Sequence, residues 1–301
     1  LLGALVDVAR RRLVLVRTWA FFVLYLSSEL MGLAACFGLW LALLAGMGRA
    51  RFDAHNFALQ CVWAETLRRG AFWLFDLRVE IRGCDLAAGP VLLLVRHCSM
   101  ADTLLPIMMV AAPHRVVLRW VMKQELLWDP CLDVVGNRLP NCFVTRHANR
   151  SAEDIALVAS LAHGMQAHDG VVIYPEGTRF TADKRERLLQ RLALEGDAAA
   201  LARAEELTHV LPPRPGGVLA LLQAESGADV VFCAHAGLEA ATSFGDLWRG
   251  DAVGRTIVIE MWRVASAAVP DTSEQQTLWL HEQWKRVNAV AADYAARHNQ
   301  R

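Results

Sequence analysis

Disulfide and zinc-binding patterns are missing from this sequence. Its seven cysteines include no CxxC pair and no zinc-ligand spacing, and an odd number cannot pair completely within one chain. We therefore expect no metal site, and reduced, buried thiols in a reducing compartment. The cysteines are Cys36, Cys61, Cys84, Cys98, Cys131, Cys142 and Cys233.

The chain has no surplus of charge of either sign. Its 31 basic and 31 acidic residues give a formal net charge of zero. Nucleic-acid-binding proteins usually have a basic surplus, so the composition argues against a nucleic-acid partner. Internal repeats and low-complexity linkers are also absent, and 301 residues suffice for one large domain or two small ones.

Apolar residues, in contrast, are in excess, at 54% with a mean hydropathy of +0.27. Residues 19–48 ("WAFFVLYLSSELMGLAACFGLWLALLAGMG") contain a single charge, Glu29. A membrane span needs roughly 20 apolar residues. A signal-peptide core has only roughly 7–15, so cleavage is the less favoured alternative. We therefore expect a membrane anchor.

Two arrangements of this anchor remain open, because arginines flank the run on both sides and give no orientation. One is a single transmembrane span, in which Glu29 at the bilayer centre costs about 2.5–3.5 kcal/mol. The other is a helical hairpin within one leaflet, with its bend near residues 27–29 or Gly32. The aromatic and basic residues of segment 57–75 suit a helix at the headgroups or one packed on the core.

After residue 78, short apolar runs alternate with longer amphipathic segments. The short runs are continuous, as in strands that are buried on both faces. This alternation predicts an α/β fold with a mostly parallel central sheet flanked by helices, in residues 79–301, behind an N-terminal membrane-embedded helical element in residues 1–78. The expected strands are 91–95, 116–121, 142–145, 171–174, 230–233 and 256–261, and the expected helices are 152–167, 182–207 and 273–296.

The stretch "HCSMAD" follows the first of these strands. Ligands of open α/β sheets gather at the carboxyl ends of the strands, where His97 would lie. Ser99 suits the N-cap of a helix, which would place Asp102 in the first turn, facing His97. The carboxylate would fix the imidazole tautomer and leave the other nitrogen as a general base. Alternatively, Asp102 only caps the helix and His97 is an ordinary strand-end histidine.

A second polar stretch, "YPEGTR", follows the strand expected at 171–174. Gly177 permits a tight turn and a close approach of a ligand. Arg179 offers a planar set of donors that suits a phosphate. The alternative is a plain turn with a surface ion pair between Glu176 and Arg179.

Two more stretches, "FVTR" and "VLPPRPGG", end near strand termini and contain Arg146 and Arg214. The prolines make the second of these a rigid loop. Each stretch alone fits an ordinary loop with an exposed arginine. At the carboxyl edge of one parallel sheet, however, all four stretches would converge on one crevice, suited to acyl or phosphoryl chemistry on an anionic substrate.

The four stretches, in this order, resemble the blocks of the 1-acylglycerol-3-phosphate acyltransferases, a family of glycerolipid acyltransferases. "HCSMAD" is similar to their His-x4-Asp block, and "YPEGTR" to Phe-Pro-Glu-Gly-Thr-Arg with Tyr174 in place of Phe. "FVTR" resembles the end of the second block, where Pro140 and Thr145 replace the usual glycine and a common aspartate. The proline-rich stretch resembles the fourth block. The resemblance covers about residues 85–235, and the long segment after "EGTRF" resembles the branch with the eukaryotic-type enzymes.

The resemblance implies transfer of a fatty acyl chain from coenzyme A or acyl carrier protein to the hydroxyl of lysophosphatidic acid, giving phosphatidic acid. His97 would be the general base, and Asp102 would orient it. The resemblance further implies membrane lipids as partners, no cofactor, and a membrane location with the catalytic domain facing the cytoplasm. The implied substrate-binding residues are Arg146, Glu176, Gly177, Thr178, Arg179 and Arg214, with Arg214 on the donor or a phosphate.

Three alternatives remain open. The acceptor could be glycerol 3-phosphate, another lysophospholipid or an amino-lipid. The chain could be a non-catalytic membrane lipid-binding protein. The thiol of Cys98, next to His97, could form an acyl-enzyme.

Overall fold

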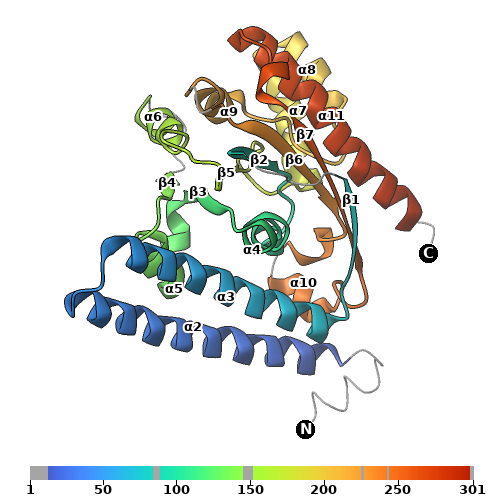
Figure 1. Ribbon diagram of the computed structural model, residues 1–301. Helices are drawn as coiled ribbons and strands as arrows, with labels where there is room; N and C mark the ends of the chain where they lie inside the picture. Colours follow the sequence, from blue (N-terminus) through green and yellow to red (C-terminus); the bar gives the residue numbers. More distant parts are fainter. Residues whose placement is uncertain (1–12, 84–88, 145–151, 225–226, 243, 299–301) are drawn as a thin grey trace.

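A seven-stranded sheet crosses the centre of the computed structural model, which describes residues 13–83, 89–144, 152–224, 227–242 and 244–298 (Figure 1). The strand order is β1-β7-β6-β2-β5-β3-β4, and every neighbouring pair is parallel except β6 and β7. The expected mostly parallel sheet is thus present. The strands are β1 (Arg78–Gly83), β2 (Val91–Val95), β3 (Val117–Lys123), β4 (Cys142–Val144), β5 (Asp169–Ile173), β6 (Asp229–Ala236) and β7 (Thr256–Val264).

Six strands match the expected ones, and β2 has the expected bounds. The strand β1, in contrast, was not expected. Half of its sequence, "RVEIRG", is charged, and five of its six residues are exposed. Charged residues are typical of edge strands, where they hinder pairing with other chains. The boundary expected between residues 78 and 79 lies at the start of β1.

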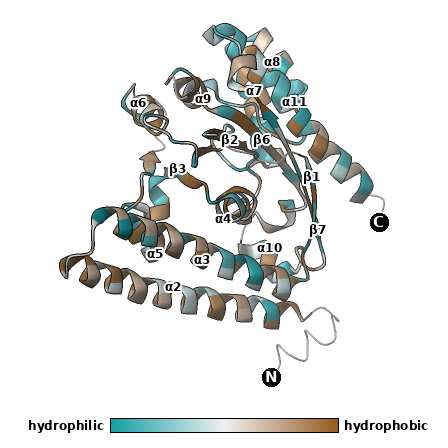
Figure 2. Cartoon of the chain, in the orientation of Figure 1, coloured by the Kyte–Doolittle hydropathy of each residue, from teal (hydrophilic) through white to brown (hydrophobic). Residues whose placement is uncertain are grey.

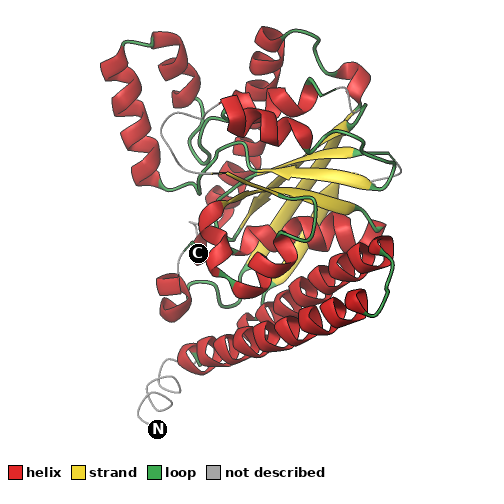
Figure 3. Ribbon diagram, turned by 90° about the vertical axis from the view of Figure 1, so that its left-hand side faces the viewer, coloured by secondary structure: helices red, strands yellow, loops and turns green. Residues whose placement is uncertain are grey.

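Alternate residues of β2 belong to two apolar cores, one on each face of the sheet. Val91, Leu93 and Val95 join the core on the face covered by helix α3 and the helical segment after His97. Leu92 and Leu94 join the core on the opposite face, beneath α6, α9 and α11. Helices therefore flank both faces of the sheet (Figure 3).

Two expected helices differ from the observed ones. The helix expected at 152–167 ends at Ser160, and Gly164 adopts a φ of +63° shortly after it. The helix expected at 182–207 is divided into two by Gly196, whose φ is +73°. The described helices are α2 (Val14–Leu44), α3 (Arg49–Phe75), η1 (Ala101–Leu104), η2 (Ile107–Ala111), α4 (Ala112–His114), η3 (Gln124–Trp128), α5 (Pro130–Gly136), α6 (Ala152–Ser160), α7 (Ala182–Glu195), α8 (Ala198–Glu205), α9 (Pro215–Leu222), η4 (Glu239–Ala241), α10 (Phe244–Arg249), η5 (Ser266–Ala268) and α11 (Ser273–His298).

The bend considered for the N-terminal run is absent, because α2 is one continuous helix of 31 residues through Glu29 and Gly32. Nothing in this leucine- and alanine-rich run interrupts the helix. The chain reverses only afterwards, where Gly46 adopts a φ of +100°. A hairpin does form, but its arms are α2 and α3, which lie side by side (Figure 1).

One face of α2 is bound to the rest of the chain. The buried carboxylate of Glu29 accepts hydrogen bonds from Trp63 Nε1 of α3 at 3.0 Å and from the amide of Cys131 in α5 at 3.1 Å. Near the two ends of the helix, Thr18 donates to the carbonyl of Leu247 at 3.3 Å and Arg138 donates to the carbonyl of Cys36 at 3.1 Å. The helix is therefore tied to the α/β domain along its length.

The other face of α2 is apolar and exposed, and Figure 2 shows the helix mostly in the hydrophobic colours. The helix is long and apolar enough to cross a membrane, and only 22% of its apolar 18-residue stretch is buried. An exposed apolar face of this length is typical of a surface that contacts lipid or protein. Its exposed large side chains are Val16, Trp19, Val23, Leu26, Leu30, Met31, Phe37, Trp40, Leu41 and Leu44.

We expect Glu29→Leu to lower the free energy of unfolding by about 1–3 kcal/mol, because it leaves the Trp63 and Cys131 N–H groups without an acceptor in a buried site. Glu29→Gln, which keeps one oxygen acceptor, should lower it less. Urea unfolding in detergent, followed by circular dichroism, measures both values. Equal stability of the Leu variant and the wild type would contradict this role of Glu29.

Candidate active site

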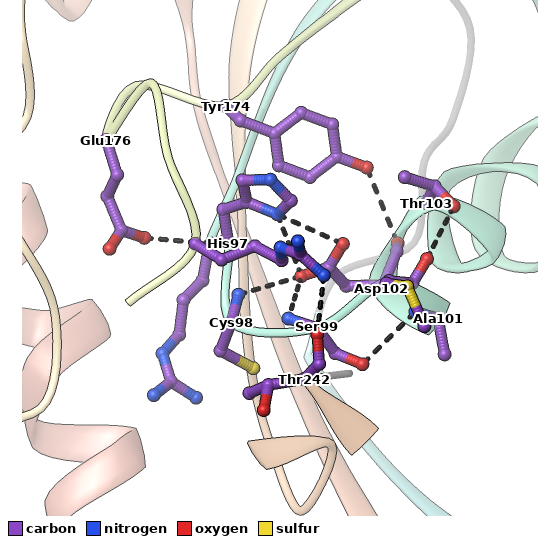
Figure 4. Close-up of polar contacts among 12 residues, drawn as sticks. His97, Cys98, Ser99, Ala101, Asp102, Thr103, Tyr174, Glu176 and Thr242 are labelled. Carbon is purple, nitrogen blue, oxygen red and sulfur yellow. Dashed lines mark hydrogen bonds and ion pairs between the residues drawn. The ribbon is translucent and has the colours of Figure 1, made fainter. Parts of the chain in front are cut away.

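His97 and Asp102 face each other at the carboxyl end of β2 (Figure 4). Nδ1 of His97 lies 3.2 and 3.1 Å from the two oxygens of Asp102. The Asp102 carboxylate is fully buried, and its Oδ2 also accepts the backbone N–H groups of Cys98 at 2.8 Å and Ser99 at 2.9 Å. The "HCSMAD" turn is therefore folded around this carboxylate.

The Asp102 contact occupies Nδ1 of His97 and leaves Nε2 as the nitrogen available to a ligand. The His97 side chain is 13% exposed and lines a cavity. The ring of Tyr174 packs against the imidazole, with ring centroids 4.7 Å apart and planes at 43°. This packing and the carboxylate together fix the orientation of the imidazole.

Glu176 joins three segments that are distant in sequence. Its Oε1 accepts the backbone N–H of His97 at 2.8 Å, and its Oε2 accepts that of Leu211 at 2.9 Å. Burial raises the pKa of Glu176 to about 7, although the two amides and Arg96 act in the opposite direction. This carboxyl group thus binds backbone amides rather than forming the ion pair with Arg179 that was the alternative interpretation.

The "YPEGTR" turn lies directly against the histidine. Gly177 adopts a φ of +68°, a conformation that favours glycine, and Phe180 N donates to the carbonyl of His97 at 2.7 Å. The Arg179 guanidinium lines the cavity and donates to the carbonyl of Thr242. Lys184, which the sequence analysis missed, donates to Thr178 Oγ1 at 2.9 Å and to the carbonyl of Arg179 at 2.8 Å.

The proline-rich loop also reaches this place. The Arg214 backbone N–H donates to the carbonyl of Pro175 at 2.8 Å, and the exposed Arg214 side chain lines the same cavity as His97 and Arg179. Arg146 lies outside the described residues. Three of the four expected stretches are thus brought together.

A buried arginine behind the site was also missed. The Arg96 guanidinium is 1% exposed, pairs with Glu239, and donates to the carbonyls of His235 at 2.5 Å and His209 at 2.8 Å. It ties the end of β2 to the end of β6 and to the loop before Leu211. The only sequence signal was an arginine directly after an apolar strand.

Cys98, Asp102 and His235 are the group of donors that could hold a metal ion among the described residues, with ligand atoms within 4.8 Å of one another. Two of them are already engaged, since Asp102 accepts two amides and Nε2 of His235 lies 2.8 Å from the carbonyl of Arg96. Cys98 and His235 therefore serve better as polar packing around Asp102 than as ligands of a metal ion.

The cavity at His97 has a volume of about 1570 Å³ and two unlike ends. Towards α2 and α3 its walls are mostly apolar, with side chains such as Phe22, Trp63 and Trp120 beside a few polar ones such as Lys123 and Glu125. Towards the proline-rich loop its walls contain Arg179 and Arg214. This shape suits a molecule with a long apolar chain and an anionic group, whose reacting atoms lie between them at His97.

Comparison with known proteins agrees with this geometry. The family model described as "Acyltransferase" matches residues 78–235, more than half of the chain. Among solved structures, the 1-acyl-sn-glycerophosphate (LPA) acyltransferase PlsC from Thermotoga maritima has a similar fold, with a TM-score of 0.58. The two sequences are 16% identical, and the match covers 92% of this chain and 95% of that protein.

A search of curated protein sequences gives no match. The family match includes the segments that contain His97, Glu176 and Arg214, and the likeness to PlsC extends to the N-terminal helices. The chain belongs to the acyltransferase family.

Proposed function

We propose that this acyltransferase moves a fatty acyl chain from a thioester to the free hydroxyl of lysophosphatidic acid, giving phosphatidic acid. The observation that carries the proposal is the His97–Asp102 pair, placed in one cavity between an apolar end and an arginine-containing end. The name of the PlsC structure is in keeping with this acceptor.

In the proposed reaction, Nε2 of His97 removes the proton of the acceptor hydroxyl as its oxygen attacks the thioester carbonyl. The tetrahedral intermediate then collapses, the carbon–sulfur bond breaks, and the imidazolium returns the proton to the leaving thiolate. Asp102 stabilises the imidazolium in between. The reaction consumes one thioester and one alcohol, yields one ester and one thiol, and needs no resident cofactor.

The acceptor phosphate would lie at Arg179, with Arg146 as a further donor. Arg179 is fixed by its bond to Thr242, and Lys184 holds Thr178 and the Arg179 carbonyl in place. In a lysophosphatidic acid the phosphate is only a few bonds from the reacting hydroxyl. A phosphate site in the turn that packs against His97 fits that short distance.

The Cys98 alternative has little support. The side chain is fully buried, and burial raises the pKa of its thiol well above the usual range, so it stays protonated and out of contact with a substrate. A direct transfer through His97 is the better fit.

We further propose that α2 lies in the membrane surface, with the α/β domain on its cytoplasmic side, rather than spanning the bilayer. The contacts of Thr18 and Cys36 with the α/β domain are 18 residues apart, or about 27 Å along the helix. The hydrocarbon core is about 30 Å thick, so a spanning α2 would draw these contacts into lipid. An interfacial helix keeps these contacts outside the hydrocarbon core and places only its exposed apolar face in lipid.

Replacing the base tests the reaction. His97→Ala should lower kcat for transfer from radiolabelled oleoyl-coenzyme A to lysophosphatidic acid by about 10²–10⁴-fold, because the hydroxyl loses its proton acceptor. His163→Ala, at an exposed histidine outside the cavity, is the control. Glycerol 3-phosphate and lysophosphatidylcholine are assayed in parallel.

Near-normal transfer by a folded His97→Ala variant would end the proposed mechanism. Product from another acceptor alone would change the acceptor and keep the chemistry. If oleoyl-coenzyme A and oleoyl-acyl carrier protein both gave no product, a non-catalytic lipid-binding protein would become the better description.

The raised pKa of Glu176 predicts a pH-dependent stability. The folded state holds the proton up to about pH 7, whereas the unfolded chain releases it near about pH 4.3. The contribution of Glu176 to the free energy of unfolding is therefore fully present below about pH 4.3. It is lost as the pH rises from there to about 7. The full loss is about 4 kcal/mol. Urea unfolding at pH 5, 6, 7 and 8 should show wild type losing more stability than Glu176→Gln, and parallel curves would contradict this.

The membrane proposal predicts that the exposed face of α2 drives lipid binding. A triple variant of Leu26, Leu30 and Phe37 to Gln should bind phospholipid vesicles at least about tenfold more weakly, since each side chain contributes about 1.5–3 kcal/mol on burial. Leu194→Gln, at a leucine of α7 that is 89% exposed, should bind like wild type. Flotation with vesicles measures both, and unchanged binding of the triple variant would refute the proposal.

A further inference from the structure

The helical pair α7–α8 is inserted between two loops of the active site. It begins directly after the "YPEGTR" turn and ends just before the proline-rich loop. Thr181 and Asp197 cap the two helices by accepting the N–H groups of Lys184 and Ala200. The segment that leads into α7 contacts His97, whose carbonyl accepts the N–H of Phe180 at 2.7 Å.

The base of the pair is fixed to the α/β domain. Nε of Arg185 donates to the carbonyl of Leu207 at 2.5 Å, and Glu206 pairs with His281 of α11 at 3.1 Å. Asn288 of α11 accepts the N–H of Thr208 at 2.9 Å. The inner side of the pair is thereby held towards α11.

This inner side extends the His97 cavity. Leu188 and Leu192 of α7 line it opposite Leu280 of α11, and two arginines, Arg191 and Arg203, line it beside them. Arg203 is half-buried, and Arg191 is exposed with Glu195 at 3.6 Å. The cavity thus continues past the acceptor end into a second region that combines cationic and apolar walls.

We infer that this second region binds the nucleotide end of an acyl-coenzyme A donor, with Arg191 and Arg203 on its phosphates. This inference rests on the proposed acyl transfer. The thioester must reach His97, while the pantetheine arm places the diphosphate and the ribose phosphate far from the reacting carbon. Arg191 lies nine residues beyond the start of α7, or about 14 Å along the helix.

This distance along α7 distinguishes the site for the donor phosphates from the site for the acceptor phosphate. The phosphate of lysophosphatidic acid is a few bonds from its hydroxyl, so it fits Arg179 and not Arg191. A nucleotide diphosphate carries several negative charges next to an apolar base, which matches arginines beside Leu188 and Leu192. The charges lie within a cavity wall, which favours a small anionic donor over the surface of a carrier protein.

The experiment measures donor KM with lysophosphatidic acid held at saturation. Arg203→Ala should raise the KM for oleoyl-coenzyme A by about tenfold, since a half-buried charge-assisted contact to phosphate is lost. For the more exposed Arg191→Ala we expect about three- to fivefold. Alanine keeps both helices intact. Arg187→Ala, on the same helix but outside the cavity, should leave the KM unchanged.

Oleoyl-pantetheine, which lacks the nucleotide, provides the decisive comparison. Wild type should prefer oleoyl-coenzyme A in kcat/KM, and Arg203→Ala should reduce that preference by about tenfold. An unchanged preference, or a higher KM for lysophosphatidic acid instead, would overturn the inference and leave acyl transfer standing. If oleoyl-acyl carrier protein alone were a donor for wild type, the inference would also fall. Absence of transfer from every thioester would instead remove the proposed function.

Discussion

The buried carboxylate of Asp102 is the constraint on which the site depends. A buried charge is costly unless hydrogen bonds surround it, and here two backbone amides and Nδ1 of His97 do so. Both amides belong to the six-residue segment "HCSMAD", which also contains the histidine. The turn therefore has one low-energy conformation, and that conformation fixes the imidazole towards the cavity. Catalytic geometry and local stability have the same cause.

A second carboxyl group extends this rigidity to the neighbouring loops. Glu176 accepts an amide from the base itself and another from Leu211, and Arg96 fixes the same two regions from below. The groups that hold the loops are thus buried and bind backbone atoms, whereas Arg179 and Arg214 reach into the cavity. Arg179 also donates to the carbonyl of Thr242, so it both lines the cavity and joins two loops.

How much the sequence predicted depended on the range of the interaction. The strand β2, the α/β fold and the facing of His97 and Asp102 are local patterns, and the sequence predicted them. Glu176 was predicted as a substrate-binding residue, with a surface ion pair to Arg179 as the alternative. Its observed partners are the backbone amides of His97 and Leu211, which are 79 and 35 residues away. The bend that was one of two alternatives for the N-terminal run does not form, because contacts with Trp63 of α3 and Cys131 of α5 accommodate Glu29 within a continuous helix. Only tertiary structure supplies such partners.

The helical pairs α2–α3 and α7–α8 lie at opposite ends of one cavity. Their positions explain the composition of each pair. The α2–α3 pair presents an apolar exposed face and an apolar cavity wall, as a lipid substrate and a membrane surface require. The α7–α8 pair is charged outside and has arginines on its inner wall, as a water-soluble anionic donor requires. The proposed acyl transfer, between a membrane lipid and a soluble thioester, would join these two environments. His97 lies between the two ends of the cavity, on a turn held by Asp102.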